Sequence, residues 1–389
     1  MRLELTSDQE FFQDTTAKFL REQVPVAEVR RLRDEAAGFE PDYWRRGAEL
    51  GWTSLLVGEA DGGGSISGNG IVDLTLVAHE FGRHAAPGPL APTNVVASAL
   101  SAAGGHPELV AGLLAGTTVA STCSGEPRPH DRLGAMATQI RVDGTDVVVR
   151  GVKRPVESAD QSSHLLVTGR TDDSGGTRDG ITQVLVPTAA PGVRRTPMRS
   201  VDLTRRFSEV HFDDVRVPLD AVVGEVGGAA AQVERQLQLA VVIANAESVG
   251  AMQVALELTI EWAFDRYSFG RPLASYQELK HRFADMKTWL EASHAISDAA
   301  ADAVASGAPV AGELVSIAKA FIGDHGSELL QDCVQIHGGI GLTFEHDLHL
   351  FLRRHTVDRA IHGTPADHRQ RITSIIERAE RDERDGHAA

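Results

Sequence analysis

Hydrophobic residues recur at helical spacing in the first 117 residues of the chain. Phe11 and Phe12 are followed by Thr15 and Phe19 at spacings of three or four positions, as on one face of a helix. The preceding run, Ser7-Asp8-Gln9-Glu10, has the pattern of a capping box, which predicts that this helix begins at Ser7. Further helices are predicted at 42–50, 71–83 and 93–103.

The pattern changes between residues 118 and 225, where β-branched and alternating segments predominate. Strands are predicted at 135–142, 146–152, 164–169, 181–187 and 207–212. Asp143-Gly144 separates the first two strands and is typical of a tight hairpin turn. The segment 171–180 is a polar, glycine-rich connection. We therefore expect an antiparallel β domain in the middle of the chain.

Long helical segments return at residue 226 and continue to the end. They are predicted at about 229–267, 274–305 and 311–335, with a last helix after Pro365 and a frayed charged tail from Glu377. Four long helices in succession favour an antiparallel four-helix bundle. The expected fold class is α+β, with a helical domain at 1–117, a β domain at 118–225 and a helical bundle at 226–389.

Composition narrows the possible functions. The chain has 389 residues, of which 42% are hydrophobic, and this supports a large core. Its formal net charge of −16 argues against a nucleic-acid binder. Two cysteines give no disulfide framework, and the first residues lack an apolar signal core, so a cytoplasmic protein is expected. The apolar run 239–256 contains Asn245 and Glu247, which favour a buried core helix over a membrane span.

Common catalytic motifs are missing, and no metal site is expected. The glycine-rich run 61–70 lacks the lysine of a phosphate-binding loop, so a flexible surface loop is the better interpretation. His346, His349 and His355 lie near Asp347, which would allow a metal ion. A solvated, charged helix face explains this histidine group more simply.

Two segments carry more specific information. The first is Arg266-Tyr-Ser-Phe-Gly-Arg-Pro followed by Gln277, in which an arginine beside a bend suits the oxygens of a diphosphate. The second is Gln335-Ile-His-Gly-Gly-Ile-Gly-Leu-Thr, whose glycines let backbone N–H groups approach a phosphate or an adenine. A helix end also explains either segment alone.

Together and in this order, the two segments resemble those of the acyl-CoA dehydrogenase family, and the resemblance extends over nearly the whole chain. It is closest to actinobacterial branches that act on bulky CoA thioesters, including those with steroid side chains. The resemblance implies FAD as cofactor and dimers or tetramers of like or paralogous subunits. It further implies an acyl-CoA substrate and an electron-transferring flavoprotein as electron acceptor. Motif position implies contacts with a neighbouring subunit's FAD from Arg266, Ser268, Phe269, Gln277, Gln335, Gly338 and Gly339. Thr364 would approach the flavin of its own subunit.

The implied reaction is α,β-dehydrogenation, which needs a carboxylate base. Glu247 is the only carboxylate in the apolar run 239–256, and the resemblance allows a base on this helix. A structural, hydrogen-bonded Glu247 is the alternative. Many relatives carry the base immediately before the Gly363-Thr364 pair, where this chain has His362, so His362 is a second candidate.

The segment 121–130 corresponds to the flavin loop of the family but lacks its Gly-Ser-Asp part, and only Ser124 is carried over as a cofactor contact. Because of this departure, two alternative hypotheses stay open. In the first, the chain is a non-catalytic partner subunit of an α2β2 enzyme. In the second, it has the same fold but performs another flavin reaction, such as nitroalkane oxidation or hydroxylation. Small residues beside Glu247, namely Ala244, Ala246, Gly250 and Ala251, are expected to leave room for a wide acyl group.

Overall fold

The computed structural model describes residues 5–127, 136–171 and 179–387. The chain forms two compact units. One contains 6–77 and 86–240, and we call it the sheet unit; the other contains 78–85 and 241–389, and we call it the bundle unit. Two helices, α4 (Gly70–His84) and α7 (Ala230–Asp265), continue from one unit into the other.

The sheet unit begins with helices, of which the first and third contribute aromatic side chains to a cluster with Trp52. These helices are α1 (Ser7–Gln23), α2 (Val26–Leu32), α3 (Pro41–Glu49), α5 (Leu90–Ala103) and α6 (Pro107–Leu114). Phe19 stacks on Tyr43 and meets the edge of Trp52, whose indole N–H donates to Thr16. The capping box lies one residue earlier than expected, because Thr6 and Gln9, rather than Ser7 and Glu10, exchange the hydrogen bonds.

Within its described residues, the sheet of this unit has seven strands: β1 (Ala120–Cys123), β2 (Gln139–Asp143), β3 (Asp146–Glu157), β4 (His164–Arg170), β5 (Ile181–Pro187), β6 (Val193–Met198) and β7 (Phe207–Pro218). The predicted hairpin is confirmed, because Asp143 pairs with Asp146. The sheet is not wholly antiparallel as expected, since β4 runs parallel to both β1 and β2. The predicted strand start at Ala135 and most of the connection 171–180 lie outside the described residues.

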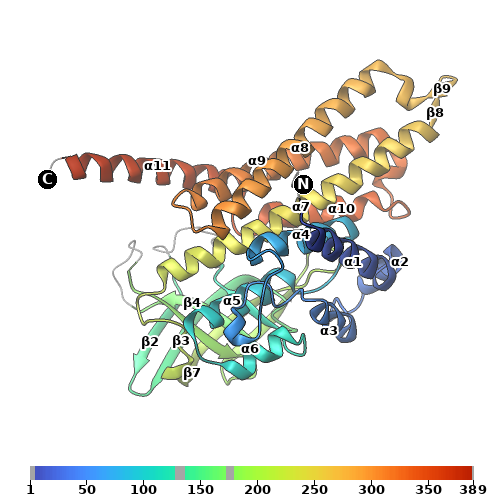
Figure 1. Ribbon diagram of the computed structural model, residues 1–389. Coiled ribbons are helices and arrows are strands. Elements are labelled where there is room, and N and C mark those ends of the chain that lie inside the picture. The colour runs from blue at the N-terminus through green and yellow to red at the C-terminus, as the bar shows by residue number, and fades with distance from the viewer. Residues whose placement is uncertain (1–4, 128–135, 172–178, 388–389) are drawn as a thin grey trace. The chain divides into compact units, whose positions relative to one another are not determined.

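Alternation along β4 and β5 builds two cores. Leu165 and Val167 lie in one cluster with Val210 and Phe212 of β7. Leu166 belongs to the second cluster, which contains residues of α5 and α6. Because successive side chains of a strand point to opposite faces, these two helices cover one face of the sheet, as Figure 1 shows.

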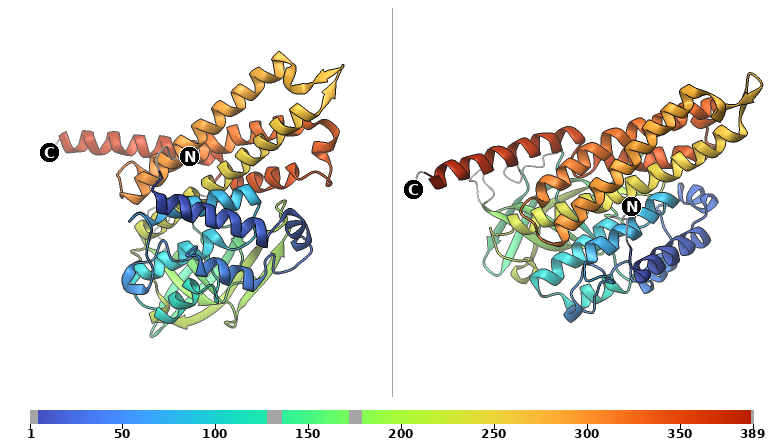
Figure 2. Two further views of the ribbon diagram at one scale, coloured as in Figure 1. Left: turned by 45° about the vertical axis from the view of Figure 1, so that its right-hand side comes forward. Right: turned by 45° about the horizontal axis from the view of Figure 1, so that its top comes forward.

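The bundle unit is built around α9 (Ala311–His337). This helix packs against α8 (Gln277–Ala305), α10 (Leu348–Ala360) and α11 (Pro365–His387). Figures 1 and 2 show α8 and α9 running alongside each other. A small hairpin of β8 (Tyr267–Ser268) and β9 (Arg271–Pro272) connects α7 to α8, and a 3-10 turn, η5 (Gly338–Leu342), follows α9.

The bundle differs from its prediction at two places. Helix α10 was expected only as a solvated face and not as a bundle helix, because its polar residues Arg354, His355 and Asp358 are buried and obscure a helical hydrophobic pattern. The charged tail was expected to fray, but α11 continues through it to His387.

The expectation of a buried core helix is supported for 239–256. Helix α7 is long and apolar enough to cross a membrane by length and composition, but 89% of its most apolar window is buried.

Candidate functional site

Glu247 of α7 is buried against an arginine of the bundle unit. Its Oε2 lies 3.3 Å from Nη1 of Arg354 on α10, and the two side chains are only 5% and 1% exposed. Fully buried charges are rare in proteins unless they are paired. The sequence predicted the buried acid but missed its partner, because the two residues are 107 positions apart.

A close helix crossing fixes the turn of α7 that carries Glu247. The last turns of α4 pass so near that a Cβ on Gly82 would lie 1.9 Å from the carbonyl oxygen of Glu247. A Cβ on Gly250 would lie 2.0 Å from the carbonyl oxygen of His79. The expectation that Gly250 leaves room for a wide acyl group is therefore wrong, because the space is filled by the backbone of α4.

A second buried contact joins α7, α9 and α10. His355 Nε2 approaches the Gly323 carbonyl oxygen at 3.3 Å and Ser327 Oγ at 3.1 Å, and its Nδ1 lies 3.0 Å from Ser248 Oγ. A carbonyl only accepts, so Nε2 carries the proton and the Ser248 hydroxyl donates to Nδ1. Burial lowers the pKa of His355 to about 4, so the ring is neutral near pH 7.

The histidine group 346–355 is therefore not the solvated face that was expected. His349 and His355 are both buried, and only His346 and Asp347 are partly exposed. No set of three or more His, Cys, Asp or Glu side chains suited to a metal ion occurs among the described residues.

His362 and Thr364 lie in the turn before α11. His362 has a left-handed backbone (φ +60), and its carbonyl oxygen accepts a hydrogen bond from His368 Nε2. The Thr364 hydroxyl donates to Asp367 Oδ2, and its backbone N–H donates to the same oxygen. Thr364 thus begins α11, and its side chain has a structural use in addition to the contact expected with a flavin.

The β8–β9 hairpin presents the first motif at the end of α7. Phe269, with φ +48, is 97% exposed at its tip. Arg266 and Gln277 are also exposed, whereas Ser268 is half-buried. Tyr276 fixes the hairpin, because its hydroxyl donates to the Ser268 carbonyl oxygen at 2.7 Å.

The second motif forms the end of α9. Gln335, Gly338 and Gly339 are exposed, and a Cβ on either glycine would meet nothing within 4 Å. Behind this turn His337 stacks on Trp262, and Arg266 lies over the same indole ring. The structure thus brings the two motifs together through Trp262.

This surface has the features expected of a site for a dinucleotide such as FAD. Trp262 Nε1 and His337 Nε2 are buried and have no hydrogen-bond partner among the described residues. Beside them are an exposed guanidinium (Arg266), exposed amides (Gln277, Gln335) and an open glycine turn. These groups suit phosphate oxygens and the edge of an adenine.

Ser124, in the sheet unit, follows β1 in a loop held by a buried ion pair. Glu126 Oε1 lies 2.9 Å from Lys153 Nζ, which also donates to the Ser124 carbonyl oxygen. Burial favours the neutral form of Glu126, but Lys153 and the backbone N–H groups of Ala137 and Thr138 outweigh it and lower its pKa. The Ser124 side chain is exposed, and residues 128–130 of the predicted flavin loop lie outside the described residues.

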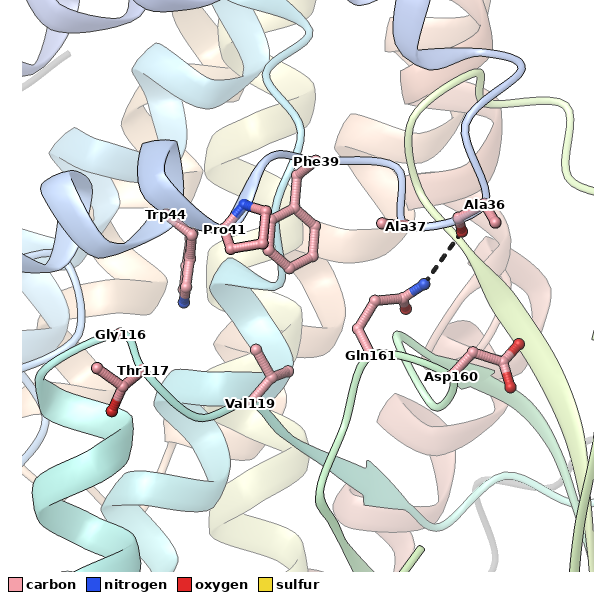
Figure 3. A pocket seen from close by; sticks show the side chains of 10 residues that line it. All are labelled: Ala36, Ala37, Phe39, Pro41, Trp44, Gly116, Thr117, Val119, Asp160 and Gln161. Carbon is pink, nitrogen blue, oxygen red and sulfur yellow. Dashed lines mark hydrogen bonds between the residues drawn. The ribbon is translucent and has the colours of Figure 1, made fainter.

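A cavity of about 430 Å³ in the sheet unit contains none of the predicted site residues. Phe39, Pro41, Trp44 and Val119 line its apolar part. Figure 3 shows Gln161 at one side, where its amide donates to the Ala36 carbonyl oxygen. Asp160 also lines it, but this carboxylate accepts a hydrogen bond from Ser208 and lies 3.8 Å from Arg195.

Comparison with protein families gives three matches along the chain. The N-terminal, middle and C-terminal domains of acyl-CoA dehydrogenases match residues 6–115, 122–215 and 228–376. The expected domain boundaries near 117 and 225 fall between the matched ranges and stay predictions.

Individual relatives agree with the family matches. Acyl-CoA dehydrogenase IpdE2 of Mycolicibacterium smegmatis is 26% identical over 374 residues, which are 96% of this chain and 100% of the relative. Butyryl-CoA dehydrogenase of Megasphaera elsdenii has a similar fold, with a TM-score of 0.87, 22% identity and coverage of 97% and 100%. The Tcur3481-Tcur3483 steroid ACAD has a TM-score of 0.85, 24% identity and coverage of 96% and 98%.

Proposed function

The chain belongs to the acyl-CoA dehydrogenase family of FAD-dependent enzymes, and we propose that it catalyses α,β-dehydrogenation of a CoA thioester with Glu247 as the base. The observation that carries this proposal is the burial of the Glu247 carboxylate on a turn of α7 that the crossing with α4 holds in place. The fold suits the reaction, because a base that acts on a weakly acidic C–H group must be positioned and shielded from water.

Glu247 removes the proton from the α-carbon, and the electron pair of that C–H bond becomes part of the new double bond. A bound FAD would supply the acceptor for the hydride that leaves the β-carbon. The oxygen of the thioester becomes enolate-like as the proton leaves and requires hydrogen-bond donors. His362 is the weaker candidate for the base, because its backbone helps to form the turn before α11.

The cofactor contacts of this proposal come from the bundle unit. Arg266 and the glycine turn at Gly338 and Gly339 would hold the diphosphate of an FAD bound to a neighbouring subunit. Gln277 and Gln335 would contact its polar edges, and Ser268 and Phe269 would complete the surface. Thr364 and Ser124 remain proposed contacts with the flavin of their own subunit.

The proposed substrate carries a bulky acyl group such as a steroid side chain, and one structure of the same fold is named a steroid ACAD. Electrons would pass to an electron-transferring flavoprotein. Turnover of a steroid side-chain CoA ester at least equal to that of straight-chain thioesters supports the substrate class. Reoxidation of the reduced enzyme by the flavoprotein, but only slowly by oxygen, supports the acceptor and excludes an oxidase or hydroxylase.

The central experiment is a spectrum of the purified protein. We expect flavin absorbance that a CoA thioester bleaches under anaerobic conditions. The second candidate is a partner subunit without its own activity, favoured by the altered loop that contains Ser124. Expression alone and with paralogous subunits separates the two proposals, because a lone chain that holds stoichiometric FAD and turns over excludes the inactive partner.

A further inference from the structure

The pairing of Glu247 with Arg354 bears on how a buried carboxylate remains able to accept a proton. Burial disfavours the charged form of a carboxyl group, so a lone glutamate in this position would be neutral near pH 7. A neutral carboxylic acid cannot act as the base. An opposite charge within about 4 Å reverses this preference, and the guanidinium of Arg354 lies 3.3 Å from the Glu247 oxygen.

We propose that Arg354 is a positioning residue that keeps the Glu247 carboxylate deprotonated and fixes its orientation before substrate binds. This inference rests on the proposed role of Glu247 as the base. Arg354 is suited to the task because a guanidinium keeps its charge when buried, and its planar group fixes the direction of the contact.

The guanidinium is itself held within the bundle. Arg354 is 1% exposed and comes from the middle of α10, which packs along α9. The next arginine, Arg353, serves another purpose, because its Nε donates to His349 Nδ1 and its guanidinium lies over the ring of Phe344. Of these two adjacent arginines, Arg354 therefore pairs with the buried carboxylate, whereas Arg353 contacts His349 and Phe344.

Other ionisable groups of the bundle unit lie on α4, α8, α9 and α10. On α4, His79 contacts Gln253, and Arg83 forms an ion pair with Glu257. On α8, burial lowers the pKa of His294 to about 3. Glu80 of α4 is also buried and lies 3.8 Å from Arg83. On α10, Asp358 is buried, and His355 is neutral and bonded to Ser248. Lys319 of α9 donates to the Asp358 carbonyl oxygen.

Pairing also affects the proton transfer itself. When the α-proton of the thioester moves to a Glu247 oxygen, the C–H electron pair stays with the substrate and the Glu247–Arg354 ion pair is lost. Loss of a negative charge beside a buried cation is unfavourable. The pair therefore opposes permanent protonation of Glu247 and favours return of the proton to solvent after product leaves.

The test compares R354M, which removes the charge, with R354K, which keeps it but lacks the planar group. Infrared spectra of each flavin-loaded protein, recorded across pH, report a protonated buried carboxyl group directly. The double variant E247Q/R354M controls for folding and for the identity of the carboxyl signal. The α-hydrogen exchange of a CoA thioester in deuterated water gives a second pH profile.

We expect no protonated-carboxyl signal from Glu247 in the wild type near neutral pH. R354M should show one that is absent from E247Q/R354M, and its exchange profile should move up by about 1–3 pH units. The infrared spectrum and the exchange profile of R354K should lie closer to those of the wild type. Wild-type spectra and an unchanged pH profile in R354M would overturn the inference and leave Arg354 a structural residue.

Failure of the proposed function would look different. If E247Q bleaches with a CoA thioester as fast as the wild type, Glu247 is not the base, whatever the infrared spectra show. If E247Q is inactive but R354M keeps the wild-type profile, only the role of Arg354 is wrong. Should R354M fail to fold, R354Q and R354K give the same comparison.

Discussion

Glu247 is the residue on which the proposed chemistry depends most, and its amide isostere tests it. E247Q keeps the size of the side chain but cannot take a proton. We expect the rate of flavin reduction by a CoA thioester to fall by about 100- to 10,000-fold, the usual contribution of a general base. Stopped-flow absorbance measures this rate.

Two variants serve as controls for E247Q. Glu257 lies on the same helix but pairs with Arg83 at the surface. In E257Q, the rate of flavin reduction by a CoA thioester should therefore stay close to that of the wild type. H362A tests the other candidate base. A large loss in H362A with little change in E247Q would transfer the role to His362.

The Glu126–Lys153 pair makes stability depend on pH in the acidic range. The folded protein holds the pKa of Glu126 below its ordinary value of 4.5, because Lys153 and two backbone N–H groups outweigh burial. This stabilisation is fully present above pH 4.5 and is lost as pH falls through the lower folded value.

E126Q should remove that dependence and leave Lys153 without its anionic partner. Breaking a buried pair costs about 3 kcal/mol, so we expect a lower free energy of unfolding at neutral pH and a flatter decline in acid. Denaturant unfolding at several pH values measures both effects. E49Q, which removes an exposed ion pair with Arg45, should change little. Parallel acid curves for E126Q and the wild type would exclude the assigned role.

At the scale of elements, the α4–α7 crossing links packing to the position of the base. Gly82 and Gly250 each face the backbone of the other helix at a distance that excludes a Cβ. G82A or G250A should force the helices apart and cost about 1–3 kcal/mol. Thermal unfolding should show the loss, and flavin reduction should slow, because Glu247 lies on the displaced turn.

G58A is the matched control for the two crossing variants. A Cβ on Gly58 would meet its nearest neighbour, the Ser101 hydroxyl, at an ordinary 3.7 Å. Its melting temperature should therefore stay close to that of the wild type. Equal melting temperatures for G58A, G82A and G250A would mean that the helices do not approach as closely as the structure shows.

The same crossing illustrates what the sequence could predict and what it could not. The apolar run of α7 revealed a buried helix and its single acid, because hydrophobic pattern is a local property. Gly250 was interpreted as space for substrate, whereas it is contact space for α4, and no local pattern distinguishes the two. Arg354 was equally hidden, because a helix that buries charged residues against distant partners lacks the expected apolar face.

The two recognised motifs were predictable for a different reason. Arg266 and the turn at Gly338 and Gly339 are marked by residue types with special geometry, and such residues identify a turn without any partner. The contact between these motifs through Trp262 and His337 was not predictable, because it joins the ends of two helices far apart in the sequence.

At the scale of the whole molecule, several large apolar side chains near the two motifs remain exposed. Phe264, Tyr267, Phe269 and Leu342 are 64%, 63%, 97% and 77% exposed. Exposed apolar residues gathered in one region indicate a protein interface. The family's assembly as dimers or tetramers would cover them, and the same interface would complete the site for the neighbour's FAD.

Phe269 offers a clean test of this assembly, because its backbone already has a positive φ that glycine adopts without strain. F269G should keep the hairpin and remove the most exposed side chain. We expect light scattering to report a lower molar mass for the assembly. The FAD bound per subunit should fall by at least the same proportion. F11A removes a side chain that is 74% exposed on α1 and should alter neither quantity. If F269G keeps both its mass and its flavin, the hairpin lies outside the interface, and the contacts assigned to Arg266 and Ser268 must be reassigned with it.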